Sequence, residues 1–311
     1  MMQATRPAIT LSTATRAASQ PDVVIVGAGP AGIAAAIQLQ RYGIRFLLFE
    51  RERIGGLLWN ANLVENYPGF PNGISGPRLA ARFLKHMQSA DVQAIPDEVL
   101  SVDVTGGDLV SRTRLHSYTS RVVIVASGTI PRPIPVDIPA HLRERVFSTV
   151  APISRLRHQR VVIVGAGDAA LDYAMNLLRH NTVTMLNRGG EIQGLPLLWE
   201  RARASRDFEY LSETDVVGFS GSGLRDGFRL LCRSQGAESS VVADYVVFAL
   251  GRLPRADFLS TRLREEEPRL LEGGQLYFAG DVWNGLMRQT AIAAGDGLRA
   301  AMQIYAGRST Q

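Results

Sequence analysis

The chain of 311 residues has a single cysteine, Cys232, so no disulfide can form within it. An internal pair of thiols that stores or relays electrons is therefore excluded. The five histidines show no spacing with cysteine or acidic residues that is typical of metal ligands, so we predict no metal site. No G-x-S-x-G motif is present, and serine hydrolase chemistry has no support.

Long apolar runs and blocks of basic residues are also missing. The longest uncharged stretch, between Asp22 and Arg41, contains Gly27, Gly29 and Pro30, and it predicts a strand, a turn and a helix rather than a membrane span. The net charge of +5 comes from scattered arginines, which does not indicate a nucleic-acid partner. This charge is compatible with a basic surface that has no specific partner, or with an acidic partner such as a small redox protein.

The N-terminal segment, residues 1–20, has two arginines, no acidic residue and many small residues. Disordered tails and organellar transit peptides share that composition, and both interpretations stay open. The lone cysteine is typical of a reducing compartment, so we expect a cytoplasmic protein. Cys232 itself alternates with charged residues on a predicted strand, and we interpret it as a small core residue rather than a nucleophile.

Two stretches of the chain resemble each other. "DVVIVGAGPAGIAAAIQLQRYGIRFLLFERE" begins at Asp22, and "RVVIVGAGDAALDYAMNLLRHNTVTMLNRGG" begins at Arg160. Each has a β-branched apolar run suited to a buried parallel strand, a glycine turn, an alanine-rich helix and a second apolar run. Each therefore predicts a βαβ unit, and the chain length is typical of two domains.

The glycine turns predict dinucleotide binding. Gly27, Gly29 and Gly32 form G-x-G-x-x-G, in which the first glycine permits a tight turn, the second lets a pyrophosphate approach the backbone, and the third lets the helix pack on the strand. The second copy has the same pattern, with Gly165, Gly167 and Ala170. Because each turn follows a strand and opens a helix, free N–H groups would meet the phosphates.

The ends of the two second strands differ. Glu50 can accept hydrogen bonds from the ribose diol of an adenosine, which favours an unphosphorylated dinucleotide in the first unit. Arg188 holds the matching place in the second unit and could bind a 2′-phosphate, which favours NADP over NAD. Arg188 could equally be a solvated charge at the end of a strand.

Near the C-terminus, "LYFAGDVWNGLMRQTAIAAGDGLRAAMQIYAG" predicts a strand, a loop and a helix. Asp281, at the strand end, could bind a ribityl hydroxyl, and the helix after Arg288 and Gln289 could direct its N-terminal dipole at an anionic flavin ring.

In one order, "GAGPAG", "GGLLWNANLVENYPGFP", "ASG", "GAGDAA", "ALGRLP", "FAGDV" and "RQTAIAAGDG" make the chain resemble the thioredoxin-reductase-like flavoproteins over about residues 20–307. The resemblance implies an α/β fold with two Rossmann-like dinucleotide-binding domains, the second inserted in the first. FAD would bind a domain of residues 21–133 and 252–311, and NADPH or NADH a domain of residues 134–251. Such enzymes are usually homodimers.

The resemblance also implies site residues. Asn66 in the loop "ENYPGF" and Asp281 would lie at the flavin and are the expected catalytic positions. The expected FAD-binding residues are Gly27, Gly29, Pro30, Ala31, Gly32, Glu50, Arg51, Gly55, Gly56, Leu57, Asn66, Val99, Ala126, Gly128, Gly280, Asp281, Arg288, Gln289 and Thr290. The expected pyridine-nucleotide residues are Gly165, Gly167, Asp168, Ala169, Ala170 and Arg188.

The sequence departs from that family at two motifs. Thioredoxin reductases carry C-x-x-C before the second glycine motif, where this chain has "STVA", Ser148 to Ala151. Their NADPH signature H-R-R-x-x-x-R is here "NRGGEIQ", which keeps one arginine of three. The chain also looks like bacterial ferredoxin/flavodoxin–NADP reductases, which lack the disulfide, but it does not have their C-terminal extension.

We therefore expect an FAD-dependent oxidoreductase in which NAD(P)H passes a hydride to the flavin. The reduced flavin would reduce a ferredoxin- or flavodoxin-like protein or a small molecule rather than a disulfide. Two alternatives stay open: a flavin- or nucleotide-binding sensor without turnover, and a flavoenzyme that acts on a small molecule without a pyridine nucleotide.

Overall fold

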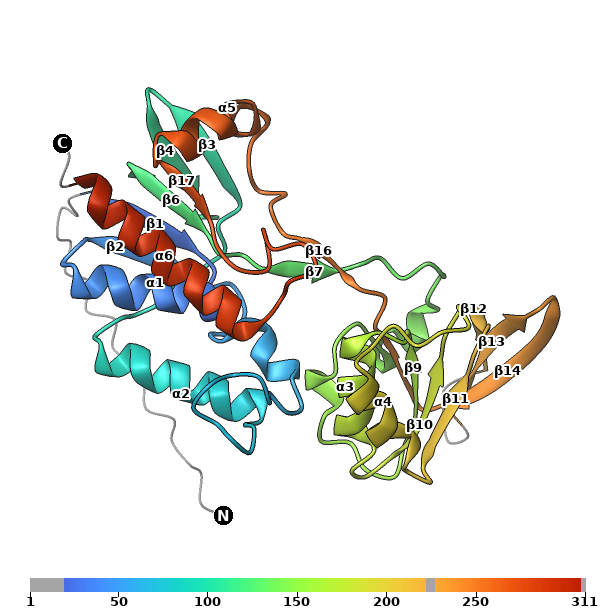
Figure 1. The fold of residues 1–311 in the computed structure, drawn as a ribbon. Helices are drawn as coiled ribbons and strands as arrows, with labels where there is room; N and C mark the ends of the chain where they lie inside the picture. The colour runs from blue at the N-terminus through green and yellow to red at the C-terminus, as the bar shows by residue number, and fades with distance from the viewer. Residues whose placement is uncertain (1–19, 222–226, 309–311) are drawn as a thin grey trace, which may run out of the picture.

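The computed structural model of the protein describes residues 20–221 and 227–308. The predicted tail, apart from Gln20, lies outside these residues. Two parallel sheets organise the chain, as Figure 1 shows, and each is built around one of the two similar stretches. The α/β fold class predicted from the sequence is confirmed.

The first sheet has four parallel strands in the order β17-β6-β1-β2. It takes its strands from both ends of the chain: β1 Val23–Val26, β2 Phe46–Phe49, β6 Val122–Val125 and β17 Leu276–Phe278. Helices α1 Pro30–Arg41, α2 Gly76–Ser89 and α6 Thr290–Arg308 lie on one side. On the other side lie α5 Thr261–Glu272 and an antiparallel sheet of β3 Ser101–Thr105, β4 Asp108–Arg112 and β5 Ser117–Ser120.

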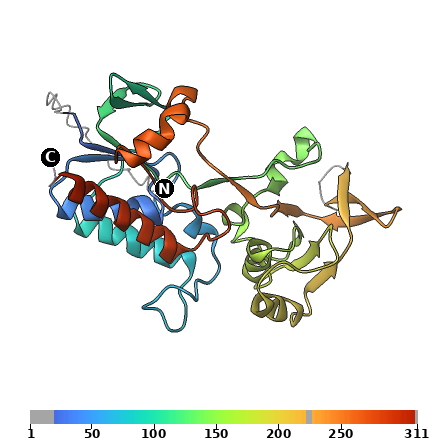
Figure 2. The same ribbon diagram turned by 45° about the horizontal axis from the view of Figure 1, so that its top comes forward.

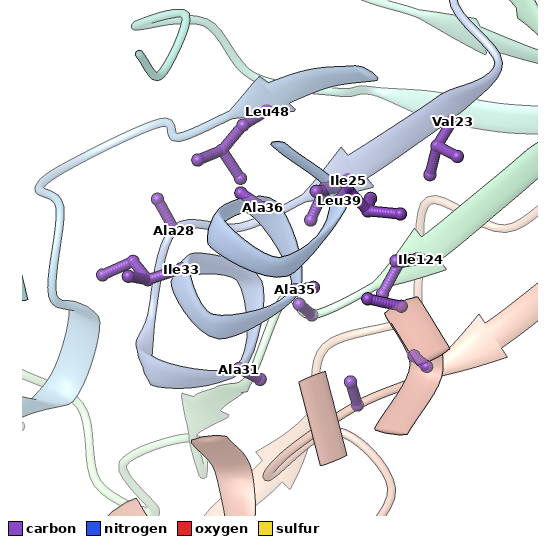
Figure 3. Close-up of a cluster of buried hydrophobic side chains, with 14 of the residues drawn as sticks. Val23, Ile25, Ala28, Ala31, Ile33, Ala35, Ala36, Leu39, Leu48 and Ile124 are labelled. Atoms are coloured by element: carbon purple, nitrogen blue, oxygen red, sulfur yellow. The ribbon is translucent and has the colours of Figure 1, made fainter. Parts of the chain in front are cut away.

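The alternation of side chains along β1 explains why both sides are covered. Val23 and Ile25 pack with α1 and α6, as Figure 3 shows for α1, whereas Val24 and Val26 pack with residues of β3, β4 and α5. A strand that is apolar on both faces needs a layer on each face. Helix α6 approaches α1 closely because Gly297 has no side chain: a Cβ there would lie 1.9 Å from the carbonyl oxygen of Ala31.

The second sheet has five parallel strands in the order β11-β10-β9-β15-β8. Its strands are β8 Val146–Phe147, β9 Arg160–Val164, β10 Thr182–Leu186, β11 Phe208–Leu211 and β15 Tyr245–Phe248. Val161 and Ile163 of β9 pack with α3 Asp168–Leu177 and α4 Pro196–Arg203. Val162 and Val164 pack with an antiparallel sheet of β12 Asp215–Ser220, β13 Phe228–Ser234 and β14 Ala237–Ala243.

Two short strands connect the sheets. β7 Thr129–Pro131 leaves the first sheet and β16 Arg252–Pro254 returns to it, and the two pair antiparallel with Ile130 opposite Leu253. Figure 2 shows them as a narrow ribbon between the two bodies. Short 3-10 helices lie at Gly56–Asn60, Ala140–Arg145 and Ala151–Ile153. No helix in the described part of the chain has the length and apolar character needed to cross a membrane.

Candidate active site

The first glycine turn is shaped by the absence of side chains. Gly27 has φ +105°, and a Cβ there would lie 2.4 Å from the carbonyl oxygen of Ala126. A Cβ at Gly32 would lie 1.9 Å from the carbonyl oxygen of Gly27. Gly29 differs, since no atom lies within 4 Å of its Cβ position and it is the N-cap of α1. The turn therefore leaves an open space in front of the free N–H groups of a helix, where an anion is stabilised.

Further predicted residues border this space. The backbone N–H of Gly55 donates to the carbonyl oxygen of Ala28, and the Cβ position of Gly56 lies 3.4 Å from Cα of Gly29. Between β6 and β7, Gly128 has φ +64° and no atom within 4 Å of its Cβ position. Pro30 is the first residue of α1, a place that needs no N–H donor.

The carboxylate of Glu50 is fixed beside the turn. It accepts hydrogen bonds from the backbone N–H groups of Ala28 (2.8 Å), Glu52 (2.9 Å) and Arg53 (3.2 Å). It borders a cavity whose other lining residues include the predicted Gly27, Arg51 and Val99, together with Asp97, Glu98, Ser127 and Arg255. A small cavity with a fixed carboxylate beside a glycine turn fits an adenosine ribose.

Sequence reasoning missed Ser127 and Arg255 in this cavity. Ser127 Oγ donates to the carbonyl oxygen of Arg255, and the Arg255 guanidinium pairs with Glu98. A pattern of strand, glycine turn and Pro-Arg occurs twice in the chain, in "RVVIVASGTIPRPIP" (121–135) and "DYVVFALGRLPRADF" (244–258), and could have indicated both residues. In the structure, Ser127 of the first stretch and Arg255 of the second line the same cavity.

The predicted flavin residues Asn66 and Gln289 are brought together. Asn66 Nδ2 donates to Gln289 Oε1 at 2.9 Å, which ties the "ENYPGF" loop to the residue before α6. Gly280, which precedes Asp281, has φ +80°. A Cβ at Gly280 would lie 3.0 Å from Cβ of Ala31 on α1. The strand end, the helix start and the first glycine turn therefore meet at one place.

Charged groups are partly buried at this place. Burial raises the pKa of Asp281, and the nearby Arg288 and Arg252 oppose that shift. Arg252 donates to Thr129 Oγ1 (2.8 Å) and to its carbonyl oxygen (2.7 Å), and burial lowers the pKa of its guanidinium. Arg288 Nε is buried and has no hydrogen-bond partner among the described residues. A buried donor without an acceptor is costly, so Nε is suited to a bound acceptor.

The second glycine turn repeats the geometry of the first. Gly165 has φ +128°, and a Cβ there would lie 2.4 Å from the carbonyl oxygen of Ala249. Gly167 is the N-cap of α3 and has open space at its Cβ position. Asp168 accepts a hydrogen bond from the backbone N–H of Leu195 at 2.7 Å, and Ala170 is buried against the sheet. Arg188 lies exposed after β10.

The segment Asn60–Asn66 also contacts the second unit. The side-chain oxygen of Asn60 accepts a hydrogen bond from the backbone N–H of Ala151 (3.0 Å), and the backbone N–H of Asn62 donates to Asp172 (2.8 Å). Arg179 donates to the Asn62 side chain at 2.6 Å, and Arg201 pairs with Glu65 at 2.6 Å. The loop is thus held by the flavin-side helix start at one end and by α3 and α4 at the other.

Asp172 is the strongly perturbed acid of this contact. Burial raises its pKa from 3.8 to about 6, although the backbone N–H groups of Asn62 and Leu63 and the charge of Arg179 act in the opposite direction. The Glu65–Arg201 pair is exposed, and such a pair contributes about 0–1 kcal/mol. No motif in the sequence predicts this contact.

The only cysteine of the chain, Cys232, is a core residue and takes no part in the site described above. Cys232 lies in β13 with 1% of its surface exposed, as a core residue should, and burial raises the pKa of its thiol. Ser148 to Ala151, where a thiol pair would stand, follow β8, and Val150 is buried. No group of His, Cys, Asp and Glu among the described residues could hold a metal ion.

Comparison with known proteins decides the family. Residues 21–297 match the model of the pyridine nucleotide-disulphide oxidoreductase family. The chain belongs to this family. It is 33% identical over 300 residues to a thioredoxin reductase of Mycolicibacterium smegmatis, with 90% of this chain and 94% of the relative covered.

Solved structures agree with the fold of this oxidoreductase. A thioredoxin reductase of Lactococcus lactis, crystallised in its FR conformation, superposes with a TM-score of 0.83 at 23% identity over 94% of this chain and all of that chain. The thioredoxin reductase of T. acidophilum gives 0.81 at 26% identity over 93% of this chain and 99% of that chain. The protein is therefore an FAD-dependent NAD(P)H oxidoreductase, a thioredoxin-reductase-like flavoprotein without C-x-x-C, as the sequence predicted.

The described residues fit FAD. The space in front of Gly29 would be filled by a Cβ and suits a pyrophosphate, the fixed Glu50 carboxylate suits an adenosine ribose, and the buried Arg288 Nε lacks an acceptor. These three features follow β1, β2 and β17 of the first sheet, as expected for a ligand at the carboxyl edge of a parallel sheet.

Proposed function

We propose that this oxidoreductase takes a hydride from a nicotinamide nucleotide and passes the electrons to an external acceptor without a protein disulfide. The observation that carries this proposal is the cysteine content: Cys232 is alone and buried, and Ser148 to Ala151 hold no sulfur. When bound, FAD supplies a two-electron centre that accepts hydride and releases electrons to a second substrate.

The residues of the chain hold and orient that cofactor. The turn at Gly27, Gly29 and Gly32 and the N-terminus of α1 would bind the pyrophosphate, and Glu50 the ribose. Asn66 and Gln289, fixed by their mutual hydrogen bond, would bind one edge of the ring system, and Asp281 with Arg288 would bind polar groups next to it. Helix α6, which has no acid in its first turn, would stabilise negative charge on the ring.

The proposed domains are residues 21–133 with 252–311, and residues 134–251. The β7/β16 ribbon supports a hinge, because two short paired strands connect the bodies, and the hydrogen bonds and the ion pair of the loop Asn60–Asn66 add side contacts between them. The second glycine turn, Gly165–Ala170, would bind the pyridine nucleotide. Rotation about the ribbon would then bring the nicotinamide to the ring and later expose the ring to the acceptor.

The acceptor that the surface supports best is a small acidic redox protein. The chain has a net charge of +5, which attracts an acidic partner at long range. Trp283, Leu286 and Met287 follow Asp281 and are 58%, 100% and 70% exposed, and a protein partner would cover such apolar side chains. On α6, Leu298, Met302 and Tyr305 are exposed in steps of four and three residues, which supports a homodimer through that helix.

The proposal is tested with the FAD-loaded protein in the absence of oxygen. We expect NADH or NADPH to bleach the flavin absorbance, and the reduced protein to reduce ferredoxin or flavodoxin at a rate that falls steeply with salt. Thioredoxin disulfide should not be reduced. Bleaching followed by reduction of quinones alone would assign the acceptor to small molecules, and no bleaching with either nucleotide would instead indicate a sensor.

A further inference from the structure

The turn that follows β10 determines which nucleotide the second unit can bind, because the adenosine ribose lies at the end of the second strand of such a unit. This turn is rigid. Asn187 Oδ1 accepts a hydrogen bond from the backbone N–H of Gly189 (3.1 Å), and its Nδ2 donates to the carbonyl oxygen of Glu191 (2.8 Å) and to the hydroxyl of Tyr210 (2.9 Å). Both polar atoms of the Asn187 side chain are therefore engaged, within the turn and with the neighbouring strand β11.

A carboxylate from another loop is fixed against this turn. The backbone N–H of Glu213, between β11 and β12, donates to the carbonyl oxygen of Gly189 at 3.1 Å. Oε1 of Glu213 lies 4.0 Å from the position that a Cβ of Gly190 would take, and Gln235 Nε2 donates to the other oxygen. Glu213 has φ +49°, which a residue with a side chain rarely adopts and which the surrounding hydrogen bonds must hold.

The charges around the ribose position oppose a phosphate. The turn itself contains one cation, Arg188, and one acidic residue, Glu191, while Gly189 and Gly190 have no side chain, and the carboxylate of Glu213 lies against the turn from another loop. A 2′-phosphate carries nearly two negative charges, so a second carboxylate beside it is unfavourable. A free 2′-hydroxyl is neutral and can donate to a carboxylate oxygen.

We propose that Glu213 is a specificity-determining residue that selects a pyridine nucleotide with a free 2′-hydroxyl, so that the enzyme uses NADH in preference to NADPH. This proposal rests on the proposed function for the identity of the ligand. Arg188 alone favoured NADP over NAD. The preference proposed here is the opposite because Glu213, which is distant from Arg188 in the sequence, is brought beside the turn by the fold.

Binding and reduction are measured separately on the FAD-loaded protein. The probes 5′-AMP and 2′,5′-ADP differ only in the 2′-phosphate, and NADH and NADPH are compared by anaerobic bleaching of the flavin. At low salt we expect AMP to bind more tightly than 2′,5′-ADP, and kcat/KM for NADH to exceed that for NADPH by about tenfold, with the ratio narrowing as salt screens the repulsion.

Two variants with the same change of charge complete the test. Glu213→Gln should lower the NADH/NADPH ratio by about threefold to tenfold. Glu238→Gln removes an exposed carboxylate from β14, in the antiparallel sheet whose first strand begins just after Glu213, and should leave the ratio unchanged. A wild-type preference for the 2′-phosphate, an equal effect of both variants, or failure of AMP to bind would overturn the proposal. The predicted binding preference without bleaching would support it while refuting the proposed function.

Discussion

The backbone N–H of Asn62 donates a hydrogen bond of 2.8 Å to the carboxylate of Asp172, although 110 residues separate the two in the chain. Asn62 belongs to the loop that reaches the proposed flavin site, and Asp172 lies on the helix that begins at the second glycine turn. The bond therefore couples the position of one dinucleotide-binding unit to a loop of the other.

Replacing Asp172 by asparagine should remove a pH dependence of stability. The folded pKa of Asp172 is about 6 and the ordinary value is 3.8, so between these values the folded protein holds a proton that the unfolded chain has lost. Wild-type stability should therefore fall as pH rises from about 4 to 6, by up to 2–3 kcal/mol in all, and then level off. Thermal unfolding of Asp172→Asn and wild type across this range measures the effect, and parallel curves would contradict it.

Placing a methyl group at Gly29 should weaken FAD binding without disturbing the fold. Its φ of −75° suits alanine, and no protein atom would touch the new Cβ, but the methyl group would stand in the pyrophosphate space. We expect Gly29→Ala to raise the FAD dissociation constant by at least about tenfold, while the cofactor-free protein melts within about 1 kcal/mol of wild type. Gel filtration and absorbance would report the FAD retained.

Gly167→Ala is the matched control, since the same geometry recurs at the start of α3. It should retain FAD and lose affinity for the pyridine nucleotide instead. Equal FAD loss in the two variants would show that the first turn is not the pyrophosphate site.

Removing the Asn66 side chain should slow flavin reduction. Asn66→Ala breaks its 2.9 Å hydrogen bond to Gln289 and frees the loop beside the proposed ring site, so the rate of anaerobic bleaching should fall by roughly tenfold or more. Asn72→Ala changes an exposed asparagine of the same region and should leave that rate unaltered. The hypothesis fails if both variants bleach at the wild-type rate.

The thiol of Cys232 should be dispensable for turnover. Because it is buried and its pKa is raised, N-ethylmaleimide should not modify the folded protein at neutral pH. Cys232→Ala should keep the rates of flavin reduction and reoxidation, at a stability cost of about 1–2 kcal/mol for the lost packing. Inactivation by the reagent, or loss of turnover in a folded variant, would restore a role for sulfur.

Adding a cation to the turn after β10 should improve the use of NADPH. Only the Asn187 side chain lies within 4 Å of the Cβ position of Gly189, at 3.7 Å, so an arginine can be accommodated. Gly189→Arg should raise kcat/KM for NADPH by about tenfold, as expected for a charged hydrogen bond to a phosphate. Steady-state kinetics with both nucleotides would measure the change, and an equal gain for NADH would argue against contact with the 2′-phosphate.

Much of the fold was predictable because its strongest constraints are local. A glycine with positive φ before a helix, as at Gly27 and Gly165, follows from a short motif, and the apolar runs beside it predict buried parallel strands. Because the strand, glycine turn and helix occur twice in the same order, the pattern is a much stronger prediction than a single glycine motif. The sequence also predicted that Cys232 is a core residue, because it alternates with charged residues along a strand. Its exposed fraction of 1% confirms this prediction.

The contacts between units were not predictable from one sequence. Asp172 belongs to no motif that predicts a contact, yet it accepts hydrogen bonds from a loop of the other unit. Glu213 had no motif, and its meeting with Gly190 depends on how β11 and β12 place a loop beside β10. Such pairings depend on the path of the whole chain and leave no periodic trace in it.

The ribbon of β7 and β16 has a consequence for where a second unit can be inserted into the first. Pro131, where the chain leaves the first unit, pairs with Arg252, where it returns, so the two ends of the intervening segment lie side by side. A segment placed between two paired strands lengthens a hairpin and interrupts no strand of the four-stranded sheet. Acquisition of a further nucleotide-binding unit at this point would therefore leave the core of the first unit intact.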